Sequence, residues 1–163
     1  VVTEMFAAYR TSLDSLEGKL GCAFSDAVDL LEGMSGTVVV CGMGKSGLVG
    51  AKITATLTST GTPSVFLHPA EAMHGDLGIV RKGDVIILIS NSGETEEITR
   101  LLPALKRLAV RIIALVGNVD STMARAADIC LDAAIDKEAC PLNLAPTTST
   151  LAALVLGLSL IHI

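Results

Sequence analysis

The sequence predicts an α/β fold built on a doubly wound parallel β-sheet with helices on both faces. Short runs of Val, Ile and Leu alternate along the chain with longer segments of helical hydrophobic spacing, as repeated strand–helix units do. Hydrophobic residues make up 50% of the 163-residue chain, yet it has only three phenylalanines, one tyrosine and no tryptophan. An aliphatic core of this kind is typical of a parallel sheet buried on both faces. We therefore expect one domain with a five-stranded, Rossmann-like or flavodoxin-like sheet.

The first half of the chain is expected to contain two N-terminal helices followed by two strand–helix units. Apolar residues recur at helical spacing from Val2 to Leu31, and Gly18 and Gly21 are expected to divide this segment into two helices. A β-branched run then predicts a strand, and a glycine-rich turn leads into the next helix. The expected elements are a strand over 37–41, a turn over 42–47, a helix over 45–59, a strand over 64–67 and a loop over 68–78 that allows one helical turn.

The second half continues the alternation of strand and helix. Pro103 is expected to kink the helix that contains it or to reset the start of that helix, because proline lacks an N–H donor. Ser121 is a plausible N-cap for a short helix. The expected elements are strands over 85–89, 111–116 and 129–131, and helices over 95–108, 121–127 and 147–161.

The turn Ser90-Asn91-Ser92-Gly93-Glu94-Thr95 is the strongest functional signal in the chain. It follows a buried strand and opens a helix, where free backbone N–H groups and the helix dipole favour an anion. Side chains of Ser90, Asn91, Ser92 and Thr95 add polar groups, and Gly93 allows close approach of the backbone. Helix capping alone would need only one of them, so the turn predicts a phosphate site.

A second glycine-rich turn, Gly42-Met-Gly-Lys-Ser-Gly47, follows the first predicted strand. It matches G-x-G-x-x-G formally, but the second strand ends Phe66-Leu67-His68 without the acid that would hold a dinucleotide ribose. It is not a Walker A loop either, because Val39 stands where the first glycine would be. The remaining interpretation is a close-approach turn in which Lys45 and Ser46 face a small ligand; a plain helix entry with a solvated lysine is the alternative.

Composition excludes several classes of partner. The formal net charge is −5, with no cluster of Lys or Arg, so nucleic acid is not an expected partner. The longest apolar run, residues 151–163, is too short to span a bilayer and fits a buried helix. The four cysteines form no C-x-x-C pair, which favours reduced thiols in a cytosolic protein over a zinc site formed by Cys140 and a histidine.

Four strings occur in order along the chain: Cys41-Gly-Met-Gly-Lys-Ser-Gly47, His68-Pro-Ala-Glu-Ala-Met-His-Gly-Asp76, Ser90-Asn-Ser-Gly-Glu-Thr95 and Glu138-Ala-Cys-Pro-Leu-Asn-Leu-Ala-Pro-Thr147. In this order and spacing they resemble the sugar-isomerase (SIS) domain of bacterial arabinose-5-phosphate isomerases. The third alone indicates only an SIS domain, whereas the second and fourth are more specific to this subfamily. The resemblance runs from about Val2 to Gly157.

The resemblance implies an aldose–ketose isomerase that interconverts D-arabinose 5-phosphate and D-ribulose 5-phosphate without a cofactor, for 3-deoxy-octulosonate in lipopolysaccharide or capsule. It also implies a cytoplasmic homotetramer whose active sites are lined by neighbouring subunits. Family members carry two CBS domains after the SIS domain, which are not found in residues 1–163. Residues 158–163 depart from the family pattern, so we expect a single SIS domain truncated at its C-terminus, with doubtful activity.

The resemblance places four candidate catalytic residues, Lys45, His74, Glu97 and Glu138. Isomerisation needs a base with a pKa near the working pH and a group that stabilises an enediolate, and the sequence does not assign these roles among the four. His68 is either structural or a ligand of an inhibitory zinc. Candidate substrate- and phosphate-binding residues are Gly44, Ser46, Gly61, Thr62, Ser90, Asn91, Ser92, Thr95, Thr147 and Thr148.

Two other functions remain open. A non-catalytic sugar-phosphate sensor would need Ser90, Ser92 and Thr95 but would have no use for Glu97, Glu138 and His74 together. Sensors of this type also carry a DNA-binding helix-turn-helix, for which residues 1–33 are too short and too acidic. An isomerase acting on a different phosphosugar is the second alternative, because no residue that would measure sugar length can be identified.

Overall fold

The computed structural model describes residues 1–161 and confirms the predicted doubly wound sheet. All pairings between its five strands are parallel, and the strand order is β2-β1-β3-β4-β5, the flavodoxin-like order. The register pairs Val38 with Ser64 and with Val85, so the central strands begin level with one another. The strands are β1 (Val38–Gly42), β2 (Ser64–Leu67), β3 (Val85–Ser90), β4 (Arg111–Val116) and β5 (Ile129–Asp132).

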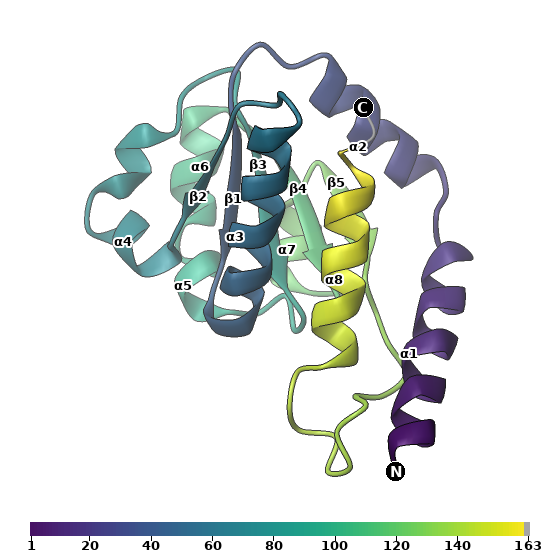
Figure 1. The fold of residues 1–163 in the computed structure, drawn as a ribbon. Helices are drawn as coiled ribbons and strands as arrows, with labels where there is room; N and C mark the ends of the chain where they lie inside the picture. Colours follow the sequence, from purple (N-terminus) through teal and green to yellow (C-terminus); the bar gives the residue numbers. More distant parts are fainter. Residues whose placement is uncertain (162–163) are drawn as a thin grey trace.

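Helices cover both faces of the sheet (Figure 1). On one face α3 and α8 lie side by side across the sheet. In the view of Figure 1, α2 lies beyond the upper end of the sheet and α1 lies beside α8. The shorter helices α4 to α7 cover the other face. Their bounds are α1 (Val2–Glu17), α2 (Cys22–Glu32), α3 (Gly44–Ser59), α4 (Pro69–Met73), the 3-10 helix η1 (Asp76–Ile79), α5 (Glu96–Thr99), α6 (Leu102–Leu108), α7 (Thr122–Ala126) and α8 (Thr148–Ser159).

Two aliphatic cores lie on opposite faces of the sheet. Alternate residues of β3 belong to each core: Ile87 and Ile89 pack with α3 and α8, whereas Ile86 and Leu88 pack with α5 and α6. This alternation follows from the period of two along a strand. The central strands are therefore buried on both sides, which explains their almost continuous Val, Ile and Leu runs.

Two helical segments differ from the simplest interpretation of the sequence. Pro103 does reset a helix: the expected helix over 95–108 is two short helices, and Pro103 sits in the first turn of α6. The segment 68–78 is more regular than the expected loop with one helical turn, since α4 and η1 both form there. The break between α1 and α2 at Gly18–Gly21 and the Ser121 cap of α7 are confirmed.

None of the helices in residues 1–161 has the length and apolar character needed to cross a bilayer. The segment 158–163, expected to depart from the family pattern, lies partly outside the described residues. Among those described, Leu160 is fully buried in the core that α3 and α8 share.

The packing of α3 against α8 depends on Gly157. A Cβ at this position would lie 2.2 Å from Ile53 Cδ1, and Ile53 is fully buried. We expect Gly157→Ala to lower the free energy of unfolding by about 1–2 kcal/mol through overpacking, measured by urea denaturation. Gly18→Ala is the matched control, because its Cβ would meet nothing closer than 3.5 Å. Adding Ile53→Val, which removes Cδ1, should recover part of the loss; a double variant with simply additive costs would contradict this explanation.

Candidate functional site

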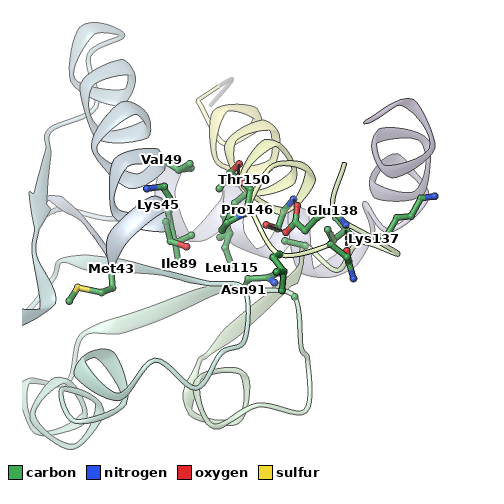
Figure 2. A pocket seen from close by; sticks show the side chains of 18 of the residues that line it. Met43, Lys45, Val49, Ile89, Asn91, Leu115, Lys137, Glu138, Pro146 and Thr150 are labelled. Carbon is green, nitrogen blue, oxygen red and sulfur yellow. Dashed lines mark hydrogen bonds between the residues drawn. The ribbon is translucent and has the colours of Figure 1, made fainter. Parts of the chain in front are cut away.

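A cavity of about 460 Å³ opens at the carboxyl ends of β1, β3 and β4, where the predicted polar turns meet (Figure 2). The N-terminal turns of α3 and α8 and the segment between β5 and α8 form its walls. Its position agrees with the rule that ligands bind beyond the carboxyl ends of parallel strands. The lining residues are Met43, Lys45, Ser46, Val49, Ile89, Asn91, Leu115, Gly117, Ala133, Ile135, Asp136, Lys137, Glu138, Asn143, Leu144, Pro146, Ser149, Thr150 and Ala153.

The cavity has an apolar floor and charged walls. Ile89 and Leu115 lie at its base, while Lys45 and Lys137 line it from different segments (Figure 2). Lys45 belongs to the first turn of α3, whose N-cap residue Met43 offers no side-chain hydrogen bond. The positive end of the helix dipole and uncapped N–H groups therefore add to the lysine charge. This side of the cavity is suited to an anion or to an oxygen that develops negative charge.

The turn that carries Lys45 is fixed by close contact between backbone segments. A Cβ on Gly47 would lie 2.6 Å from the carbonyl oxygen of Gly42, and Gly44 has a φ of +57°. Glycine accommodates both the approach and the positive φ. The turn over 42–47 is thus a tight strand-to-helix connection that brings Lys45 and Ser46 to the cavity.

The serine-rich turn after β3 is organised around the buried hydroxyl of Ser90. Its Oγ lies 2.8 Å from Thr95 Oγ1 and 3.4 Å from Ser92 Oγ, and it accepts the Gly93 N–H at 3.0 Å. Gly93 has a φ of +66°, and its carbonyl accepts the Met123 N–H from α7. Three predicted phosphate-binding hydroxyls therefore gather at one point.

The predicted site residues fall on two faces of the sheet. Asn91 follows Ile89 into the cavity, whereas Ser90 continues the face of Leu88, toward α5 to α7. His74, the exposed C-cap residue of α4, and half-buried Glu97, in α5, do not line the cavity. One chain thus brings Lys45, Ser46, Asn91 and Glu138 together, and places Ser90, Ser92, Thr95, His74 and Glu97 on elements of the opposite face.

The Glu138 carboxylate is fully engaged with the start of α8. Its Oε2 accepts the Thr147 N–H at 2.8 Å, the Thr147 hydroxyl at 3.0 Å and the Ser149 N–H at 3.2 Å. Its Oε1 accepts the Ser149 hydroxyl. Burial raises the pKa of the Glu138 carboxyl, but the hydrogen bonds from Ser149 and Thr147 outweigh it, so this pKa lies below its ordinary value. That direction is opposite to the one expected for a base poised near neutral pH.

The other predicted residues lie away from the cavity. Thr148 is fully buried, and its hydroxyl has no hydrogen-bond partner among the described residues. Gly61 and Thr62 precede β2, so they lie at the opposite end of the sheet. The His68 Nδ1 accepts the Ala70 N–H as the N-cap of α4, which is a structural use of the ring. Within residues 1–161, no three His, Cys, Asp or Glu side chains are grouped closely enough to hold a metal ion.

Sequence reasoning missed Asp136, Lys137 and Asn143, which line the cavity from the segment between β5 and α8. Asn143 lies within the Glu138–Thr147 string, and Asp136 and Lys137 directly precede it, which is the only sequence signal for the three. The thiols were anticipated: all four cysteines are free, and burial raises the pKa of Cys41 to about 12, so this thiol is inert at neutral pH.

Glu94 ties the serine-rich turn to α7. Its Oε1 accepts the Thr122 N–H at 2.7 Å, and this hydrogen bond holds the pKa of Glu94 below its model-peptide value of 4.5. A lowered folded-state pKa adds stability above pH 4.5 that is lost as the pH falls through the folded value.

We therefore expect the thermal stability of Glu94→Gln to fall less than that of the wild type between about pH 5 and pH 3, as followed by circular dichroism. Glu32→Gln, at the exposed end of α2, should keep the wild-type slope, and an unchanged slope in Glu94→Gln would contradict the cap.

Comparison with known proteins confirms the resemblance seen in the sequence. A family model described as SIS domain matches residues 34–163. Arabinose 5-phosphate isomerase KdsD of Pseudomonas aeruginosa is 57% identical over 148 residues, which cover 91% of this chain and 45% of that protein. Arabinose 5-phosphate isomerase KdsD of Escherichia coli K12 is 54% identical over 154 residues, 94% of this chain and 47% of that protein. The chain therefore spans about half the length of the curated relatives it matches.

The fold likeness is equally close. A solved structure of an Escherichia coli CFT073 protein in complex with arabinose 5-phosphate superposes with a TM-score of 0.94 at 38% identity, covering 99% of this chain and 86% of that one. The parallel sheet, the serine-rich turn after β3, the family match and these relatives all agree. The chain belongs to the SIS domain family and, within it, is related in sequence to the arabinose 5-phosphate isomerases.

Proposed function

We propose that this chain carries the active-site domain of an isomerase that interconverts D-arabinose 5-phosphate and D-ribulose 5-phosphate. The observation that carries the proposal is a cavity with Lys45 and Asn91 on its walls, where Asn91 belongs to the hydroxyl-rich turn that is suited to a phosphate. The names of the relatives and the sugar-phosphate complex of the structural neighbour support the same substrate. The chain also shares the more specific motif strings at 68–76 and 138–147.

The reaction moves a carbonyl group from C1 to C2 of the sugar. A base removes the proton from C2, and the electron pair moves to O1 to give an enediolate. The hydroxyl proton then passes from O2 to O1, and a proton is returned to C1 as the C2 carbonyl forms. The electrons stay within the sugar, so the step itself needs no redox cofactor. Lys45 is positioned to stabilise the enediolate or to pair with phosphate, while Ser90, Ser92 and Thr95 supply hydroxyls to the phosphate. The proton carrier comes from the set His74, Glu97 and Glu138.

We also propose a homotetramer with shared active sites, in the cytoplasm. The predicted catalytic groups divide between two faces of one chain, and a neighbouring subunit offers a way to complete each cavity.

Mixing Lys45→Met with His74→Asn subunits should then restore activity that neither variant has alone. Mixed assemblies that remain as inactive as the separate variants would contradict sharing. Four free thiols suit a reducing compartment, where the interconversion of the two sugar phosphates would feed 3-deoxy-octulosonate for lipopolysaccharide or capsule.

The test of the proposed function separates turnover from binding. The purified chain is incubated with D-arabinose 5-phosphate, and the formation of ribulose 5-phosphate is followed; binding is measured by calorimetry, with unphosphorylated D-arabinose as the control. Turnover and weaker binding of the unphosphorylated sugar would support the proposal. Tight binding without turnover would favour a phosphosugar sensor, and turnover of a hexulose 6-phosphate alone would favour a different isomerase.

A further inference from the structure

Glu138 closes the base of a loop that forms one wall of the cavity. The loop comprises residues 139–146, between the Glu138 carboxylate and the first turn of α8. The donors to this carboxylate are two backbone N–H groups and two hydroxyls, all from Thr147 and Ser149. Thr147, the N-cap residue of α8, offers no side-chain cap, so Glu138 takes over the capping from outside the helix.

Further hydrogen bonds fasten the same closure. The Ala139 N–H donates to Thr147 Oγ1 at 3.0 Å, and the Glu138 N–H donates to Asn143 Oδ1 at 2.7 Å. Asn143 itself adopts a φ of +53°, which an asparagine tolerates better than most residues. The two ends of the loop are therefore joined by polar contacts to the Glu138 carboxylate and the Asn143 side-chain amide.

Apolar packing contributes little to holding this loop. Leu142 is 74% exposed and Leu144 is 77% exposed, and of the loop residues only Ala139 is buried. Asn143, Leu144 and Pro146 nevertheless line the cavity (Pro146 in Figure 2). The position of this wall thus depends on the hydrogen bonds at the loop base rather than on the core.

The same geometry leaves Glu138 poorly suited to remove a proton from carbon. An ionised carboxylate offers about four lone-pair sites. Three donors meet at Oε2 and one at Oε1, so only Oε1 keeps room for a further donor, and the hydrogen bonds to the charged form stabilise it as a charge. Taking up a substrate proton would break contacts that hold both the loop and the helix terminus.

We propose that Glu138 is a positioning residue: its carboxylate clasps the loop 139–146 to the start of α8 and so sets one wall of the cavity, without itself transferring a proton. Its relevance to catalysis rests on the isomerase function proposed above, whereas the clasp can be tested without any activity. Proton transfer then falls to the other predicted groups, Glu97 or His74.

The first measurement is hydrogen exchange of the Thr147 and Ser149 amides together with limited proteolysis of the loop 139–146. Glu138→Ala should speed the exchange of both amides at least tenfold and expose the loop to cleavage. Glu138→Gln should lie between this variant and the wild type, because an amide oxygen can accept part of the hydrogen bonds. Glu71→Gln, an exposed acid on α4, should leave both readouts unchanged. Unchanged exchange and cleavage in Glu138→Ala would overturn the clasp even if the enzyme proved inactive.

The second measurement compares kcat/KM of the same variants across pH. For a positioning role, kcat/KM should fall about tenfold in Glu138→Gln and about a hundredfold in Glu138→Ala, in step with the loss of loop protection in each variant. The decrease of kcat/KM at low pH (the acidic limb of the profile) should remain in both. A Glu138→Gln protein with wild-type loop protection, a loss above a thousandfold and no acidic limb would show that Glu138 is the base. Absence of turnover in the wild type would count against the proposed isomerase and leave the exchange result standing.

Discussion

Replacing Lys45 by methionine is expected to lower kcat/KM for D-arabinose 5-phosphate by about a hundredfold to a thousandfold. The side chain lies in the first turn of α3, is exposed to the cavity and is not used in any hydrogen bond or ion pair among residues 1–161. Methionine keeps much of the length and apolar stem but removes the charge. A cation that meets developing negative charge contributes several kcal/mol in a site that excludes water, which corresponds to the expected loss.

The division of this loss between kcat and KM identifies what Lys45 contacts. A fall confined to kcat would mean that the ammonium stabilises the enediolate, whereas a rise confined to KM would mean that it binds the phosphate of the ground state. Lys52→Met is the matched control, because Lys52 lies exposed on the same helix and its ammonium group donates to Thr56. If kcat/KM of Lys45→Met stayed within threefold of the wild-type value, Lys45 would have no catalytic role.

The fold could be predicted from the sequence because each central strand is indicated both by its composition and by the turn that follows it. The buried run 85–89 is continuous in Ile, Val and Leu and ends in a polar turn, and the observed β3 differs from it by one residue. The regularity of the segment 68–78 could be predicted only as far as one helical turn, for a physical reason. A helix of five residues has too few residues to show a hydrophobic period, although His68 followed by Pro69 is a good start signal.

The part of the candidate site that follows the carboxyl ends of the strands could be predicted, because these ends meet at one edge of a parallel sheet. Lys45, Asn91 and Glu138 are far apart in the sequence, and the parallel sheet places them in one cavity. The separation of Ser90 from Asn91 was also encoded, since adjacent strand residues face opposite ways. The hydrogen bonds of Glu138 were not, because they depend on how the loop 139–146 closes rather than on any periodic pattern.

Gly47→Ala is expected to lower the free energy of unfolding by about 3 kcal/mol. The added Cβ would lie 2.6 Å from the Gly42 carbonyl oxygen and 3.2 Å from its carbonyl carbon. Both are backbone atoms of β1, so no side-chain rotation can relieve the overlap. The structure can respond only by moving the start of α3 away from the sheet, which also displaces Lys45 from the cavity.

Gly78→Ala separates this effect from the general cost of losing a glycine, because a Cβ at Gly78 would meet no heavy atom within 4 Å. Urea denaturation of both variants gives the stabilities, and calorimetry with D-arabinose 5-phosphate gives the binding. We expect Gly47→Ala to lose stability and affinity together while Gly78→Ala keeps both, since one backbone contact sets both the packing of α3 and the position of its first turn. Equal stabilities of the two variants would mean that the β1–α3 turn accommodates the added methyl group without cost. Other contacts in the cavity wall would then have to hold Lys45 in place.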